Sequence, residues 1–138
     1  KGLADTWPEV VCLHIDSLLL ETDKQYRIKA AKLLKKVLRK GGSSAWDLVS
    51  WALNDESDEV RRIAAKTLPT LANKEPRVAT LFAERAMVDV DPEVRISAIK
   101  AIQNWIRIMV ERKTLYFLEL GARTCKFVRP VSICYHAC

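Results

Sequence analysis

The chain has 138 residues, of which 49% are apolar, and a net charge of +6. Four glycines and five prolines are too few for low complexity or disorder over most of the chain. No run of about 18 uncharged apolar residues exists, so we expect no membrane span. Because the start, Lys-Gly-Leu-Ala-Asp, has neither an initiator Met nor the apolar region of a signal peptide, we expect a segment of a longer chain.

The charge is unevenly placed. Residues 1–40 give +4, 41–74 give −1, 75–108 give 0 and 109–138 give +3. The segments 41–74 and 75–108 thus contain charges of both signs. A continuous basic stripe would be a stronger indication of nucleic-acid binding than this distribution is. The four cysteines do not resemble a secreted disulfide framework. We therefore expect an intracellular protein, in the cytoplasm or nucleus, with Cys12 as a buried free thiol.

Three helical hairpins are predicted in chain order, over about 7–40, 43–74 and 75–108. Apolar residues at helical spacing fill both arms of each hairpin. The second arms span about 24–40, 58–72 and 92–105, and each follows a short acidic turn whose side chains can satisfy exposed N–H groups. Pro69 falls inside the second of these arms, where it should kink or shorten the helix.

Residues beyond Trp105 allow two interpretations. The segment 106–120 is apolar at helical spacing, and it could continue the third hairpin or begin a fourth unit. Adding 34 to the numbers of apolar residues in the third unit gives apolar residues in this segment as well. This slightly favours a partial fourth unit over 109–121, with a helix end at Gly121. We therefore predict a repeat array over 1–121 and an irregular extension over 122–138.

A period of 34 residues links the three hairpins. Arg27, Arg61 and Arg95 are 34 apart, each follows an apolar or aromatic residue, and each precedes an alanine by three positions. Lysines recur five positions after each arginine, at Lys32, Lys66 and Lys100. A fixed period over three copies indicates a repeat architecture.

The motif Asp-x-Asp-Pro-Glu-Val-Arg-x-x-Ala at 89–98, with related copies at 55–64 and 21–30, resembles HEAT and HEAT-like repeats. Tetratricopeptide and ankyrin signatures are absent. The resemblance implies an all-α fold, a right-handed α-α superhelix of three HEAT-like hairpins plus a partial fourth unit. It also implies that second helices line a concave face and that most relatives are protein scaffolds, some of which bind nucleic acid.

The same resemblance implies a structural ladder of arginines between repeats. Its members are Arg27, Arg61 and Arg95, paired either with the turn acids Asp55, Asp89 and Glu21 or with Asp91 and Asp23. An anion site built from these arginines is the weaker interpretation.

The recurring lysines are predicted to line one face, which either binds a partner or is simply solvated. The candidate partner-binding residues are predicted to lie on the concave face: Lys29, Lys32, Lys36, Arg39, Arg62, Lys66, Lys100 and Trp51. An acidic protein segment is the favoured ligand, and nucleic acid bound to the lysine ladder is the alternative. Exposed ends of the array could also mediate self-association.

Neither catalytic activity nor metal binding has much support in this sequence. His14 lies in an apolar helical run and is predicted to be packed, and no phosphate loop or nucleophile motif is found. The tail residues Cys125, Cys134, His136 and Cys138 are zinc ligand types at an unusual spacing. We therefore predict a non-enzymatic protein with no metal and no cofactor.

Overall fold

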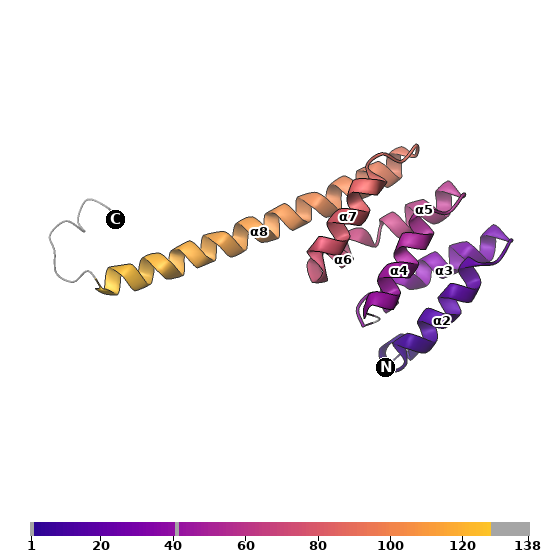
Figure 1. Cartoon of the computed structure of the whole chain (residues 1–138), viewed down its shortest axis with the longest axis horizontal. Helices are drawn as coiled ribbons and strands as arrows, with labels where there is room; N and C mark the ends of the chain where they lie inside the picture. The colour runs from indigo at the N-terminus through magenta and orange to yellow at the C-terminus, as the bar shows by residue number, and fades with distance from the viewer. Residues whose placement is uncertain (1, 41, 128–138) are drawn as a thin grey trace. The chain divides into compact units, whose positions relative to one another are not determined.

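The computed structural model describes residues 2–40 and 42–127, with side chains described up to residue 120 (Figure 1). The described residues form eight α-helices and no β-strand. The helices are α1 Leu3–Thr6, α2 Pro8–Leu19, α3 Lys24–Val37, α4 Gly42–Leu53, α5 Asp58–Ala65, α6 Leu68–Lys74, α7 Pro76–Ala86 and α8 Pro92–Phe127. One compact unit ends at Trp105, and a second begins at Ile106.

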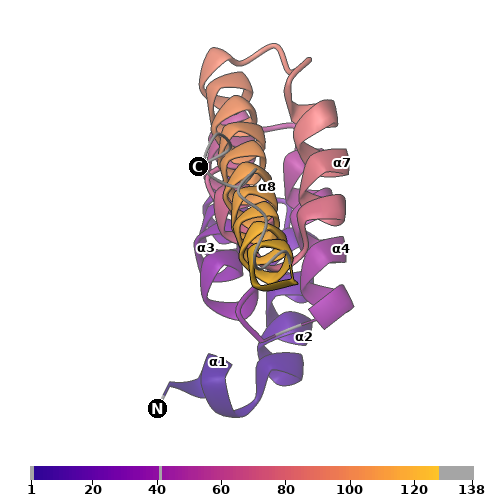
Figure 2. The same ribbon diagram turned by 90° about the vertical axis from the view of Figure 1, so that its left-hand side faces the viewer.

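The first unit is a stack of helical hairpins in two layers. Helix α2 packs on α3, α4 packs on α5, and α7 leads into the first part of α8. Contacts between repeats join α2 to α4 and α4 to α7 in one layer, and α3 to α5 in the other. Figure 2 shows α4 and α7 along one side of this unit and α3 on the opposite side. The predicted all-α repeat solenoid is confirmed.

Acidic residues organise the turns as the period predicts. The side chain of Asp23 accepts a hydrogen bond from Gln25 N at 2.8 Å and caps α3. Ser57 and Asp91 are the equivalent residues of the next two turns: Asp91 accepts from Glu93 N at 2.8 Å, whereas the Ser57 side chain makes no capping hydrogen bond. A second contact recurs 34 residues apart two positions earlier, since Asp55 accepts from Ser57 N and Asp89 accepts from Asp91 N, both at 2.8 Å. These carboxylates satisfy N–H groups in the turns that precede α5 and α8.

The core is built from small and branched residues at repeat positions. Ala30, Ala64 and Ala98 are all fully buried, and a small side chain there lets neighbouring helices approach closely. Val60 and Val94 are fully buried as well. Tyr26 occupies the equivalent position in the first copy and is 44% exposed, so the first repeat departs from the pattern at this residue.

Pro69 divides the second arm of the middle hairpin, as expected. Helix α5 ends at Ala65 and α6 begins at Leu68, which places Pro69 in the first turn of α6, where no N–H bond is required. The hydroxyl of Thr67 in the break is buried and donates to the carbonyl of Ala64 at 2.6 Å. The backbone N–H of Thr67 donates to the same carbonyl at 2.9 Å.

Helix α8 corrects the prediction for the end of the array. It runs without interruption from Pro92 to Phe127, so the expected helix end at Gly121 is wrong. A single glycine inside a helix costs only about 1 kcal/mol relative to alanine, which neighbouring turns can absorb. Residues 106–120 continue the helix of the third hairpin, and 109–121 form no separate fourth-unit helix. The division into an array over 1–121 and an extension stays a prediction, and residues 128–138 of that extension lie outside the described residues.

Candidate partner-binding site

Two arginines connect neighbouring repeats through equivalent contacts. Nε of Arg27 donates to Oδ2 of Asp55, and Nε of Arg61 donates to Oδ2 of Asp89, both at 2.9 Å. In each case Nη1 also donates to two carbonyl oxygens of the arginine's own turn, at 2.8 to 3.2 Å. Each guanidinium thus ties its own turn to the turn of the next repeat.

A second carboxylate supports each of these arginines. Nη2 of Arg27 donates to Glu56 at 2.7 Å, and Nη2 of Arg61 donates to Asp58. The two arginine residues are only 7% and 9% exposed, so their charges depend on these partners. The hydrogen bond to Asp89, followed by the attraction of both carboxylates, raises the pKa of Arg61 against the opposing effect of burial.

Arg95 lacks the inter-repeat contact. Its Nη1 donates to the carbonyl oxygens of Asp89 and Val90 at 2.7 and 2.9 Å, and no carboxylate among the described side chains pairs with it. The reason is the continuation of α8, which brings no further acidic turn back to this arginine.

Arg62 and Asp91 form a contact that the period did not indicate. Nε of Arg62 donates to Oδ2 of Asp91 at 2.6 Å, and the Asp91 residue is only 4% exposed. This hydrogen bond holds the pKa of Asp91 below its ordinary value, with further lowering by the N–H groups of Glu93 and Val94, while burial opposes it. The guanidinium of Arg62 thus pairs with the next repeat while its side chain is 40% exposed, and its grouping with the partner-binding cations stays a prediction.

The remaining cations of the first repeat form an exposed surface, here called the α3 basic surface: Lys29, Lys32, Lys36 and Arg39. Within the described part of the chain none of these four forms an ion pair with a carboxylate. Nζ of Lys29 lies 4.9 Å from the ring centroid of Tyr26. A pocket of about 290 Å³ is lined by Lys35, Lys36, Arg39 and Thr70, and so reaches from α3 to α6 of the next repeat.

The other two recurring lysines are also exposed. Lys66 follows the end of α5, and Lys100 lies on α8 within the first unit. Neither forms an ion pair with a described carboxylate. Their alignment with Lys32 into one binding surface stays a prediction.

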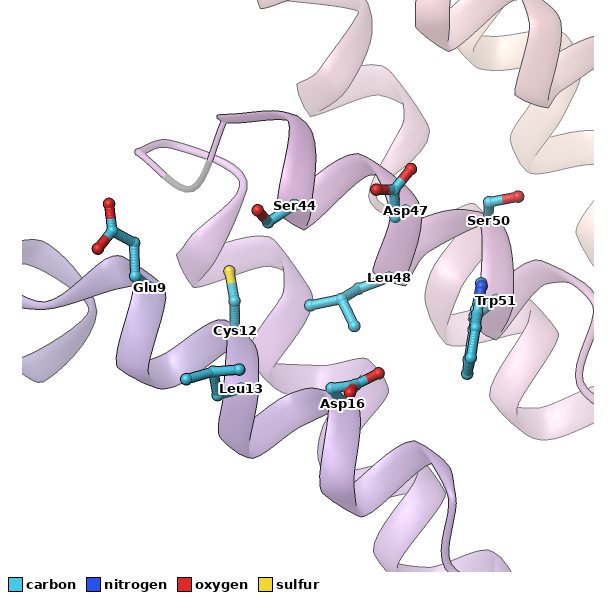
Figure 3. A pocket seen from close by; sticks show the side chains of 9 residues that line it. All are labelled: Glu9, Cys12, Leu13, Asp16, Ser44, Asp47, Leu48, Ser50 and Trp51. Atoms are coloured by element: carbon cyan, nitrogen blue, oxygen red, sulfur yellow. The ribbon is translucent and has the colours of Figure 1, made fainter.

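Trp51 lies in a different place from the predicted one. It belongs to α4, a first helix, and is therefore not part of the second-helix layer with which we grouped it. Leu48, Val49 and Ala52 take the buried positions of α4, which leaves Trp51 on the outer side, 55% exposed. There it lines a pocket of about 540 Å³ between α2 and α4, together with side chains shown in Figure 3.

Sequence reasoning missed this pocket. Its other lining residues are Glu9, Cys12, Leu13, Asp16, Ser44, Asp47, Leu48 and Ser50. The available signal was the spacing of Glu9 and Asp16, which lie seven residues apart and therefore on one side of a helix.

Two further predictions concern reactive side chains, the imidazole of His14 and the thiol of Cys12. His14 is exposed rather than packed, since the buried positions Val11, Cys12, Ile15 and Leu19 leave it outside the core-facing arc of α2. Cys12 is a buried free thiol, as expected, and burial together with the nearby charge of Glu9 raises the pKa of its thiol.

The described residues bear on two further features, a metal site and a membrane span. Cys134, His136 and Cys138 lie outside those residues, as does the side chain of Cys125. In the described part, no group of three or more His, Cys, Asp or Glu side chains could hold a metal ion. Likewise, none of its helices combines the length and apolar character needed to cross a membrane.

The two-layer stack and the arginines that join its turns define a helical-repeat protein built from paired helices. Family comparison gives the particular class: the model for HEAT repeats matches residues 15–103, and the chain belongs to this family. HEAT repeats are commonly protein-interaction scaffolds and generally non-catalytic. Comparisons with curated proteins and with solved structures give no match.

Proposed function

We propose that this chain is a non-catalytic scaffold that binds an acidic segment of a partner protein on the face formed by the second helix of each repeat. The observation that carries the proposal is the α3 basic surface, whose four cations are exposed and have no carboxylate partners among the described residues. Lys29, Lys32 and Lys36 follow helical spacing, so they present their charges on one side of α3.

The arrangement suits carboxylates on an extended or helical segment. The pocket lined by Lys35, Lys36 and Arg39 also reaches Thr70 of α6, so an acidic side chain at its opening would lie beside three cationic side chains. Neighbouring charges on the segment would then reach Lys32 and Lys29. Lys66 and Lys100, also exposed, would extend the contact to the later repeats.

Nucleic acid is the alternative ligand of the same cations. A phosphate backbone would be attracted to them without sequence preference. Its affinity would fall steeply as the salt concentration rises, because the release of counterions on binding then becomes less favourable. The aromatic side chain that lies among these cations, Tyr26, is already covered by Lys29, which reduces its use for base stacking. We therefore favour the acidic protein segment.

The test compares a fluorescein-labelled oligo-glutamate peptide with a labelled DNA duplex and an RNA strand, by fluorescence anisotropy at low and physiological salt. The variant Lys32→Gln/Lys36→Gln/Arg39→Gln removes three charges from the α3 basic surface. The matched control Arg77→Gln/Arg85→Gln/Arg112→Gln removes three exposed charges that lie outside it.

Peptide binding that is at least about tenfold weaker in the first variant and nearly unchanged in the control supports the proposal. Tighter binding of duplex or RNA at physiological salt, lost in the same variant, would establish the nucleic-acid alternative instead. Equal losses in both variants would show a general charge effect and would contradict a binding site on α3.

A further inference from the structure

The pocket between α2 and α4 has an apolar interior that is open to solvent. Leu48 points from α4 toward α2, and Cys12 lies on the facing side of α2 (Figure 3). Leu13 is 71% exposed and Trp51 is 55% exposed, so two large apolar side chains border the opening. The volume of about 540 Å³ is within the usual range of ligand sites, roughly 300–1,000 Å³, and admits a few side chains rather than a folded domain.

The same pocket carries three carboxylates and no cation. Glu9, Asp16 and Asp47 line it, and none of the three forms an ion pair with a described side chain. In Figure 3 the carboxylates of Glu9 and Asp47 point outward from the two helices, whereas Asp16 lies nearer the gap between them, so the three charges border the apolar surface of Leu13 and Leu48. This local excess of negative charge occurs in a chain whose net charge is +6.

We propose that this acidic-rimmed pocket binds a basic segment of a partner protein, in which lysine or arginine side chains alternate with apolar ones. The apolar side chains would bury themselves against Leu13, whose contact with water is now unfavourable, beside the small part of Leu48 that lines the pocket. The cations would pair with the rim carboxylates, and one of them would lie over the indole of Trp51, the aromatic ring that binds cations best.

Charge complementarity selects this occupant over others. An acidic segment or a phosphate backbone would be repelled by the three carboxylates, whereas the aliphatic stems of lysine and arginine suit an apolar surface with a charged rim. The pocket lies in the layer of α2 and α4, whereas the α3 basic surface lies in the layer of the second helices. The inference therefore stands independently of the function proposed above.

The probe is a short fluorescein-labelled peptide in which arginine alternates with leucine, and its counterpart has glutamate in place of every arginine. The test variant Glu9→Gln/Asp16→Asn/Asp47→Asn removes the three rim charges with little change in side-chain size. The control Glu75→Gln/Glu84→Gln/Glu119→Gln removes three exposed charges from outside the pocket, so both variants have the same net charge. A third variant, Trp51→Leu, keeps an apolar side chain and removes the indole.

We expect the arginine peptide to bind the wild type and to shift the Trp51 indole N–H signal in a nitrogen–proton NMR spectrum, with that signal assigned by its absence in Trp51→Leu. Affinity should fall at least about fivefold in the rim variant, about threefold in Trp51→Leu and less than about twofold in the control. The glutamate peptide should not bind at this pocket.

Three results would overturn the inference. Equal losses in the rim variant and the control would mean that only overall charge matters. An arginine peptide that binds without shifting the Trp51 signal would place its site elsewhere. If the wild type dimerises in sedimentation experiments and the rim variant does not, then the occupant is a second copy of this chain and not a different partner.

Discussion

Removal of the Asp89 charge tests the reasoning about the contacts between repeats. Asp89 accepts hydrogen bonds from Nε and Nη2 of Arg61 at 2.9 and 3.3 Å, and the side chains of this pair are 11% and 12% exposed. The change Asp89→Asn keeps the size of the side chain and leaves one oxygen for the N–H of Asp91. It deprives Arg61 of its main charged partner.

The magnitude follows from two opposing considerations. Loss of one partner of a buried ion pair costs about 3–5 kcal/mol, because the other charge is left without compensation. Asp58 remains beside Arg61, and two backbone carbonyls still accept from its Nη1, so part of the compensation survives. We therefore expect the free energy of unfolding to fall by about 2–3 kcal/mol.

Urea denaturation followed by helical circular dichroism measures this change, with Glu84→Gln as an exposed control that should alter stability by less than about 0.5 kcal/mol. A double-mutant cycle of Asp89→Leu and Arg61→Met isolates the pair, since its coupling energy excludes effects that each change has alone. An Asp89→Asn variant as stable as the control, or a coupling energy near zero, would refute the view that this pair holds the second and third repeats together.

Three further predictions use the same denaturation assay. Arg95→Met should destabilise the chain less than Arg61→Met, because Arg95 donates only to carbonyl oxygens; the reverse order would contradict this. Leu68→Ala removes a fully buried side chain and should cost about 2–5 kcal/mol, whereas Leu81→Ala, at a site 59% exposed, should cost far less, and similar losses would refute the assigned burial. For Arg62→Met we predict a pH-dependent loss. The pKa of Asp91 is lowered in the folded state by Arg62, so the stability that this pair contributes is present above the ordinary carboxyl pKa of about 3.9 and is lost as pH falls through the lowered value. The difference in urea midpoint between wild type and Arg62→Met should therefore shrink below about pH 4, and a difference that stays constant there would contradict the pairing.

Local signals made the repeats predictable from sequence. The period of 34 placed Arg27, Arg61 and Arg95 at equivalent turns, and Pro69 indicated the break between α5 and α6 because its missing N–H is a local property. The end of α8 could not be predicted in the same way. The single residue Gly121 lowers helix stability only slightly, so the outcome depended on the rest of the helix and not on the glycine.

Apart from the arginine ladder, which the resemblance to HEAT repeats implied, contacts between different repeats could not be predicted from the sequence pattern. The pairing of Arg62 with Asp91 depends on how far one repeat is offset from the next, which packing decides. The acidic-rimmed pocket likewise requires that α2 and α4 be neighbours, so that Glu9 and Asp16 from one helix meet Asp47 from the other. Periodicity assigns a face to each residue, but it does not give the distance between faces of separate helices.

The two layers of the first unit carry opposite charge, so the net charge of +6 does not predict the charge of a ligand for either layer. The α3 basic surface and the acidic-rimmed pocket lie in different layers. One helix with its side chains is about 10–12 Å across, which exceeds the Debye length of about 8 Å at physiological salt. Each proposed surface would therefore act on a ligand largely by itself, and a partner attracted to one would not be strongly repelled by the other. If both proposals hold, an acidic and a basic segment could bind at the same time, because their binding surfaces lie in different layers.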